Sequence, residues 1–171
     1  MPTTAPYWMA VARKYVGLEE VPGPQSHPTI VQWAKNLGGF VAQFFRTDST
    51  PWCSLYANVV LQESGLPMSG PDGSPALLRA KSFLTYGTPL DVPCLGAILV
   101  FVRSGGHHVS FYTGESLKAY RVLGGNQDDR VRESWLAKDR CIAIRWPDPN
   151  VVPGTHIWVR PGDASLSTNE Q

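Results

Sequence analysis

The spacing of apolar residues changes near Pro93, and this change constrains the fold more than any other feature of the chain. Before Pro93, apolar residues recur three and four positions apart, as in 26–37 and 51–65, which is typical of helices with one buried face. After it, 96–102 is a continuous apolar run and 107–112 alternates apolar with polar residues, as strands do. Helices followed by strands predict an α+β fold, in which a helical N-terminal half packs on an antiparallel sheet.

Capping and turn residues place the other elements of the first half. A helix over 7–16 is predicted to end at Gly17, Ser26 to cap a second helix, and Ser74 to begin another. The segment 40–46 is apolar, and its period does not decide between helix and strand.

In the second half, strands are predicted over 107–112, 117–123 and 141–146, and 130–135 is expected to be a short strand or a loop. The turn 113–116 makes the first two an antiparallel hairpin. Counting back from this turn sets residues near 123 beside His108, so that 124–127 emerges close to the imidazole.

Length and composition limit the classes of protein that the chain can belong to. With 171 residues, we expect one domain over 1–147 and a C-terminal extension over 148–171, which has one possible strand at 156–160 and a polar tail. The net charge of +1 gives no case for a nucleic-acid partner. No apolar run approaches the roughly 20 residues that a membrane span needs, so we expect no membrane span.

The beginning of the chain and its cysteines indicate where it is made. Residues 1–6 lack the basic and apolar regions of a signal peptide, and the three cysteines have neither CxxC spacing nor a clustered histidine partner. We therefore expect no disulfide framework, no metal and no cofactor, and synthesis in a reducing cytoplasm.

Cys53 lies in the first turn of the helix predicted over 51–65. Ser49 or Thr50 can cap this helix, and Gly65 can end it. The amide hydrogens at a helix N-terminus stabilise a thiolate, so this position is expected to lower the pKa of the thiol and prepare a nucleophile.

The alternative is a buried structural cysteine, because free cysteines are among the most buried residues. Cys94 and Cys141 fit that description, since neither stands beside a helix start. For Cys53 the nucleophile is favoured because a histidine partner is found downstream.

His108 is the expected partner. If Val109 and Phe111 face the core, alternation points His108 to the polar side of its strand and leaves His107 at the rim. Asn126 or Gln127 could accept a hydrogen bond from the far ring nitrogen and fix the tautomer, although Gly-Gly-Asn also suits a plain turn. We give no catalytic role to His27 or His156.

Several segments carry a family resemblance. They are 8–12, 21–24, 51–54, 106–115, 122–127 and 145–147. In this order and spacing they resemble the papain-like cell-wall hydrolases of bacteria and phages that are related to the NlpC and CHAP peptidases, over roughly 6–147. The chain departs from that pattern at Ala97, where an aspartate is frequent, and at His107 and Ser110, where residues are small.

The resemblance implies a papain-like fold and cleavage of an amide in the peptide stem of peptidoglycan. It assigns Cys53 as nucleophile, His108 as general base and Asn126 as the residue that orients the base. Candidates for the wall of the substrate cleft are Trp52, Tyr56, Gln127 and Asp128.

The bond most expected to be cut joins D-glutamate to the diamino acid. The alternative within the resemblance is an N-acetylmuramoyl-L-alanine amidase of the CHAP type. Two further classes stay open, which are an inactive or binding relative and a cysteine acyltransferase or deamidase that acts on proteins.

A cytoplasmic chain with a substrate in the periplasm or cell wall needs delivery. The phage lysin (endolysin) and the secreted antibacterial effector or toxin both fit this requirement. An effector would be accompanied by an inhibitor (immunity) protein that covers the cleft in the producing cell.

Overall fold

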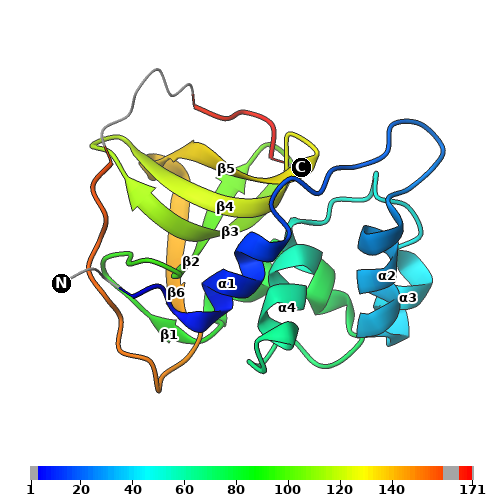
Figure 1. Ribbon diagram of the computed structural model, residues 1–171, viewed down its shortest axis with the longest axis horizontal. Helices are drawn as coiled ribbons and strands as arrows, with labels where there is room; N and C mark the ends of the chain where they lie inside the picture. Colours follow the sequence, from blue (N-terminus) through cyan, green and yellow to red (C-terminus); the bar gives the residue numbers. More distant parts are fainter. Residues whose placement is uncertain (1–3, 160–165, 171) are drawn as a thin grey trace.

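One curved antiparallel sheet of six strands, in the order β1-β6-β2-β3-β4-β5, forms one side of the molecule (Figure 1). The computed structural model describes residues 4–159 and 166–170. The strands are β1 (Thr88–Pro89), β2 (Ile98–Arg103), β3 (Gly106–Glu115), β4 (Ala119–Gln127), β5 (Arg130–Ala137) and β6 (Cys141–Trp146). The helices are α1 (Tyr7–Lys14), α2 (Pro28–Leu37), α3 (Gly39–Phe44) and α4 (Cys53–Glu63), with 3-10 helices η1 (Pro75–Leu78), η2 (Ala80–Thr85) and η3 (Lys138–Arg140). The predicted α+β class and antiparallel sheet are confirmed.

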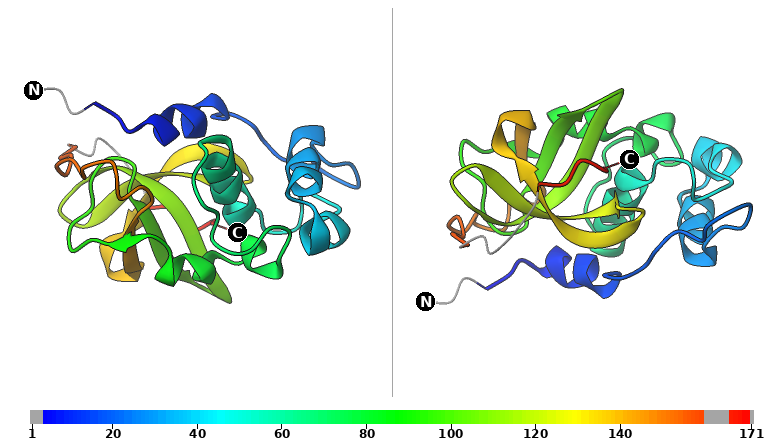
Figure 2. Two further views of the ribbon diagram at one scale, coloured as in Figure 1. Left: turned by 90° about the horizontal axis from the view of Figure 1, so that it is seen from below. Right: turned by 90° about the horizontal axis from the view of Figure 1, so that it is seen from above.

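Helix α4 lies between the sheet and the pair α2 and α3 (Figure 2). It contacts β3 and β4 on one side and α1, α2 and η1 on the others. Every residue from Cys53 to Leu61 is buried, so the helix has no exposed face over this length. The sequence predicted one buried stripe, and burial on all sides holds the helix more firmly than a stripe would.

The ends of several elements differ from the prediction. Trp52 is the N-cap residue of α4 and makes no side-chain cap bond, whereas Ser49 or Thr50 was expected there. His27, and not Ser26, caps α2, because its Nδ1 accepts a hydrogen bond from the Thr29 amide at 3.2 Å. Cap positions depend on where the chain enters a helix, and neighbouring polar residues compete for that place.

The segment after Ser74 forms two 3-10 helices in place of the predicted helix. The Leu77 carbonyl accepts hydrogen bonds from Ser54 Oγ at 2.9 Å and from Asn58 Nδ2 at 3.0 Å. Two polar side chains of α4 therefore take a carbonyl that a continuous helix would use itself. Tertiary contacts override the local helical preference here.

The β3–β4 hairpin has an irregular register. Leu123 pairs with Phe111, and the register shifts between Tyr112 and Gly114. The expectation that residues near 123 lie beside His108 was wrong, because the shift and a longer β3 move the pairing along the strand. The pairs between β3 and β4 end at Phe111, so β4 departs from β3 before it reaches the level of His108.

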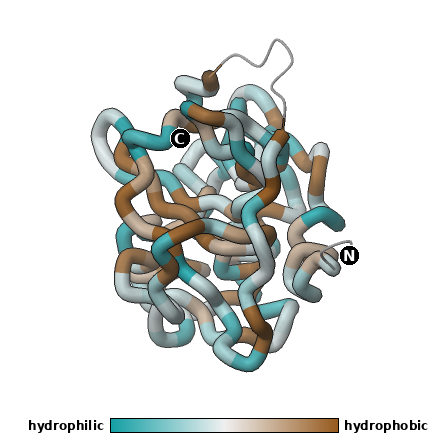
Figure 3. Tube along the Cα trace, turned by 90° about the vertical axis from the view of Figure 1, so that its left-hand side faces the viewer, coloured by the Kyte–Doolittle hydropathy of each residue, from teal (hydrophilic) through white to brown (hydrophobic). Residues whose placement is uncertain are grey.

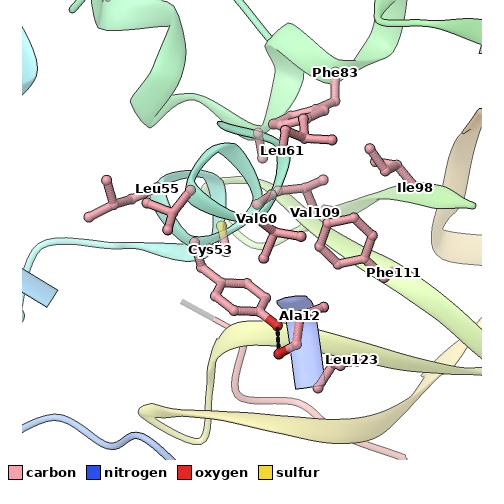
Figure 4. Packing of buried hydrophobic residues seen from close by; sticks show 14 of the residues in the cluster. Ala12, Cys53, Leu55, Val60, Leu61, Phe83, Ile98, Val109, Phe111 and Leu123 are labelled. Carbon is pink, nitrogen blue, oxygen red and sulfur yellow. Dashed lines mark hydrogen bonds between the residues drawn. The ribbon is translucent and has the colours of Figure 1, made fainter. Parts of the chain in front are cut away.

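The core fills the space between α4 and the sheet. Val109 and Phe111 of β3 lie with Val60 of α4 and Ile98 of β2 in the buried cluster (Figure 4). Along the chain trace, apolar stretches cross the middle of the molecule between hydrophilic turns (Figure 3). No helix among the described residues is long and apolar enough to cross a membrane.

The C-terminal extension makes contacts with the sheet. Trp158 forms an isolated parallel bridge with Glu115, so the strand expected at 156–160 is reduced to one bridge, and residue 160 lies outside the described residues. Glu170 forms an antiparallel bridge with Gln127 and an ion pair with Arg140 at 2.7 Å. The polar tail is therefore attached at the end of β4.

Candidate active site

Cys53 is the first residue of α4, as the sequence predicted, and it is 4% exposed. The first amide groups of a helix have no partner within the helix, so they are free to face a group at its N-terminus. The amides of Cys53 and Ser54 both act to lower the pKa of the thiol, and so does the amide of Val109 in β3. The sulfur therefore lies where the helix start meets the strand.

Burial nevertheless raises the pKa of the Cys53 thiol above its usual value. The expected lowering was wrong, because removal from water outweighs the three amides and the charge of Arg103. In this arrangement Cys53 is a neutral thiol at neutral pH. A base must remove its proton when it reacts.

His108 is completely buried in β3, one residue before Val109. Val109 and Phe111 face α4, and His108 takes the other side of the strand, as the alternation predicted. His107 is half-buried at the rim. The Nε2 atom of His108 lies 3.0 Å from Gln127 Oε1.

The amide of Gln127 decides the tautomer of His108. Its Nε2 donates to the carbonyls of Arg132 at 2.5 Å and Val122 at 3.3 Å, so the amide nitrogen is held by two acceptors. Oε1 is therefore the atom that faces the ring, and it can only accept. The imidazole must carry its proton on Nε2, which leaves a lone pair on Nδ1.

Nδ1 of His108 is buried and has no hydrogen-bond partner in the described part of the chain. Burial lowers the pKa of His108 to about 4, so the ring is neutral at neutral pH. The Val109 amide, which reaches the sulfur, belongs to the next residue along the strand. Figure 4 shows the sulfur of Cys53 directed toward β3 near Val109. No hydrogen bond joins the two groups: the sulfur meets the backbone of β3 at Val109, whereas the ring of His108 lies with Gln127 on the other side of the strand.

Asn126, which the resemblance assigns to orient the base, makes no hydrogen bond to the imidazole, and Gln127 makes the hydrogen bond to Nε2. Asn126 Oδ1 accepts from the Trp52 amide at 3.1 Å, and its Nδ2 donates to Glu20 Oε1 at 2.8 Å. The Trp52 indole donates to the same Glu20 oxygen at 2.6 Å. Asn126 therefore ties β4 to the residue before Cys53, while Gln127 ties β4 to His108.

None of the residues expected to form the cleft wall lines a described cavity. Trp52 and Tyr56 are completely buried, and the Tyr56 hydroxyl donates to the Ala12 carbonyl at 2.8 Å, which is the dashed line in Figure 4. Gln127 is buried on His108, and Asp128 accepts from Arg132 at 2.6 Å. Large aromatic residues beside a buried cysteine are as suited to a core as to a cleft, and here they form the core.

A cavity of about 380 Å³, which we call the cationic groove, is lined by residues near Cys53 and His108 in the sequence but by neither of the two. It is lined by Phe44, Thr50, Pro51, Leu78, Arg79, Ala80, Lys81, Arg103, Gly106 and His107. Pro51 lies two residues before Cys53, and His107 immediately precedes His108. In the sequence, the groove is indicated only by two cations, Arg79 and Lys81, within an otherwise apolar segment.

A second cavity, of about 500 Å³, lies away from the candidate pair. Its lining comes from 67–70, Ser82, 85–88 and the prolines at 147 and 149, and it includes neither Cys53 nor His108. It is the larger of the two, but its lining offers no pair of groups for acid and base chemistry.

All three cysteines are free. Burial raises the pKa of Cys94, and it raises that of Cys141 to about 11, so neither thiol ionises readily. Among residues 4–159 and 166–170, no group of three or more His, Cys, Asp or Glu side chains could hold a metal ion.

Comparisons of the chain with protein-family models, with curated proteins and with solved structures find no match.

Proposed function

We propose that the protein is a papain-like cysteine hydrolase that cleaves an amide bond in the peptide stem of peptidoglycan. The observation that carries the proposal is the buried, unpartnered Nδ1 of His108, whose neighbour in the strand donates toward the Cys53 sulfur. A buried nitrogen without a partner is costly to the fold, and the proposal explains it as the base that takes the proton of the thiol once the ring and the sulfur are brought together.

In the first half of the reaction, the sulfur of Cys53 attacks the amide carbonyl while its proton moves to Nδ1 of His108. The amide C–N bond then breaks, the leaving nitrogen takes that proton, and an acyl thioester remains on Cys53. Nε2 keeps its proton throughout, because Gln127 Oε1 accepts from it at 3.0 Å. Gln127 also stabilises the imidazolium that forms for a moment between the two transfers.

In the second half, water attacks the thioester and gives a proton to Nδ1. The C–S bond breaks, the proton returns to the sulfur, and a carboxylic acid leaves. The oxyanion of both steps is expected at the N-terminus of α4, where the Cys53 and Ser54 amides have no partner within the helix.

The choice of substrate comes from the resemblance of 51–54, 106–115 and 122–127 to the NlpC and CHAP peptidases. Of the bonds in the stem, we propose the one between D-glutamate and the diamino acid. The bond between muramic acid and L-alanine is the second candidate from the same resemblance.

The experiment is to incubate the purified protein with soluble peptidoglycan fragments and to identify the products by mass spectrometry. We expect release of fragments that begin with the diamino acid. The Cys53→Ala variant is expected to release no fragments. The control is Cys94→Ala, which removes another buried thiol and should keep wild-type activity when it is folded.

Circular dichroism of each variant verifies that it is folded. Cleavage by folded Cys53→Ala at the wild-type rate would refute the thiol mechanism. No product from reduced wild-type protein would count against hydrolysis of the stem.

A further inference from the structure

Three cations converge on the cationic groove from two separate segments. Arg79 and Lys81 flank the start of η2, and Arg103 ends β2. None of the three takes part in an ion pair within the described residues. By contrast, six other cations do so: Lys14, Arg121, Arg130, Arg132, Lys138 and Arg140. The groove therefore gathers positive charge that the protein leaves unneutralised.

No carboxylate lines the groove among the described residues. The chain as a whole carries a net charge of only +1, so this concentration of charge is local. Arg103 also acts electrostatically on both Cys53 and His108, which places its charge within reach of the candidate pair. An anionic group bound here would meet a cation whose field also reaches Cys53 and His108.

The rest of the lining is apolar and aromatic. Phe44 is 58% exposed and stacks on Phe40 with 5.2 Å between ring centroids and 14° between planes. Pro51 and Leu78 add further apolar surface. Such a lining suits short carbon chains that carry a charged end, and cavities of this size accept a few amino-acid residues.

We propose that the cationic groove binds carboxylate groups of the substrate on one side of the amide that is cut. The ligand class is a peptide that contains acidic amino acids with free carboxylates. The proposal rests on the proposed function for the choice of peptide, while the binding itself requires no cleavage.

Arg79 and Lys81 are the positions at which substitution tests the proposal most directly. Both side chains are exposed, and within the described residues neither side chain makes a hydrogen bond to the rest of the protein. Arg103 has a structural part as well, since its Nε donates to the His107 carbonyl at 3.3 Å and its Nη1 to the Ser104 carbonyl at 3.2 Å. Replacement of Arg103 would disturb the β2–β3 turn. Arg103→Lys is therefore the variant to use at that position.

The test measures binding to the folded Cys53→Ala protein by isothermal titration calorimetry. Two synthetic stem peptides are compared, one with the free α-carboxylate of D-glutamate and one in which that carboxylate is an amide. We expect the free acid to bind about fivefold more tightly, because one ion pair at a largely exposed site contributes roughly 1 kcal/mol or less, which corresponds to that ratio.

The same comparison is repeated with Arg79→Ala and Lys81→Ala in the Cys53→Ala background. Each is expected to lower affinity for the free acid and to leave affinity for the amide unchanged. Lys118→Ala, an exposed cation outside the groove, is the matched control and should change neither. The preference for the free acid should decrease as salt is raised.

Equal binding of the two peptides, or equal loss for both in the groove variants, would overturn the proposal. Displacement of the free acid by inorganic phosphate as readily as by glutarate would also overturn it, because the groove would then be a general anion site. If the wild-type protein cleaves no stem peptide but the free acid still binds more tightly, carboxylate binding in the cationic groove is supported and the proposed hydrolase activity is refuted. Cleavage of the stem peptide without a preference for the free acid would support the proposed enzyme and refute carboxylate binding in the cationic groove.

Discussion

At the scale of single residues, two neighbours in β4 hold the two halves of the candidate site. Asn126 accepts from the amide of Trp52, and Gln127 accepts from the ring of His108. Asn126 has a φ of 58°, in the left-handed region that asparagine tolerates better than most residues. This backbone angle lets two consecutive side chains reach in different directions.

Gln127→Ala is predicted to lower kcat by about 100-fold and to change KM little, because the imidazole loses the group that sets its tautomer and direction. Gln127→Glu should move the acidic limb of the pH profile of kcat/KM upward, since a carboxylate favours the protonated ring. Steady-state kinetics over pH measure both effects. Gln62→Ala, on the exposed side of the α4 C-terminus, is the control.

A merely structural Gln127 would lower the amount of folded protein and leave the pH profile of the remainder in place. Asn126→Ala is predicted to act differently, because it releases the start of α4 and not the ring. Its pH profile should keep the wild-type shape at a lower kcat.

The sequence correctly places Cys53 at a helix start and His108 in a strand, but it cannot choose between Asn126 and Gln127. Alternation along 107–112 and the helix start at 51–54 are local signals, and they identify the positions of the thiol and the ring. The two amides point in different directions because the strand is irregular between Gly124 and Gln127 and Asn126 has a positive φ, which no local pattern indicates. The raised pKa of the thiol likewise depends on burial by distant segments.

At the scale of elements, β4 and α4 approach each other unusually closely at Gly125. A Cβ atom there would lie 2.7 Å from Tyr56 Cβ and 2.8 Å from the Trp52 ring. Glycine at 125 therefore permits the contact that brings the end of β4 to the start of α4. At Gly124, a Cβ would lie 2.8 Å from Gln127 Oε1, so this glycine makes room for the amide on His108.

Gly125→Ala is predicted to lower the free energy of unfolding by about 1–3 kcal/mol, because neither buried ring can move aside without strain. Denaturation with urea measures the change. Gly106→Ala is the control, since a Cβ there would meet only the Arg103 guanidinium at 3.8 Å or more. An equal loss in both variants would mean that the close approach is not the cause.

Most strands and α-helices are predictable from period alone, whereas the 3-10 helices are not. Residues 98–103 and 141–146 form strands because their β-branched and apolar residues suit a buried sheet. The segment 75–85 has helical spacing, yet Ser54 and Asn58 of α4 take its Leu77 carbonyl. A contact between segments about twenty residues apart cannot be inferred from the spacing within one of them.

At the scale of the whole molecule, the candidate pair is enclosed. The imidazole of His108 is completely buried between the sheet and the chain around Glu170, whose charge acts on it together with those of Arg103 and Arg140. The exposed fraction of Cys53 is only 4%, so a peptide can reach the sulfur only if part of this enclosure opens. Burial of an ionisable ring also has a consequence for global stability.

The protein is predicted to lose stability as pH falls from about 6.5 to about 4. His108 has a pKa of about 4 when folded and an ordinary value of 6.5, so the unfolded chain binds a proton in this range that the folded protein does not. The loss from this group is complete below about pH 4 and amounts to about 3 kcal/mol at most. Above pH 6.5 the ring is neutral in both states and contributes no pH dependence.

Urea denaturation at several pH values between 4 and 7.5 measures this loss in the wild type and in His108→Gln. The glutamine has no titrating group, and we expect its pH dependence to be shallower over this range. Identical slopes for the two proteins would show that other groups cause the acid instability.

The pairing of Glu170 with Gln127 and Arg140 has a practical consequence for anyone who prepares this protein. A purification tag or fluorescent fusion attached close to Glu170 would lie near the backbone of Gln127, whose side chain holds the histidine. Such an appendage would crowd the imidazole and lower the measured activity. That low activity would then be mistaken for a property of the protein itself. A cleavable tag, removed before any assay, avoids that error.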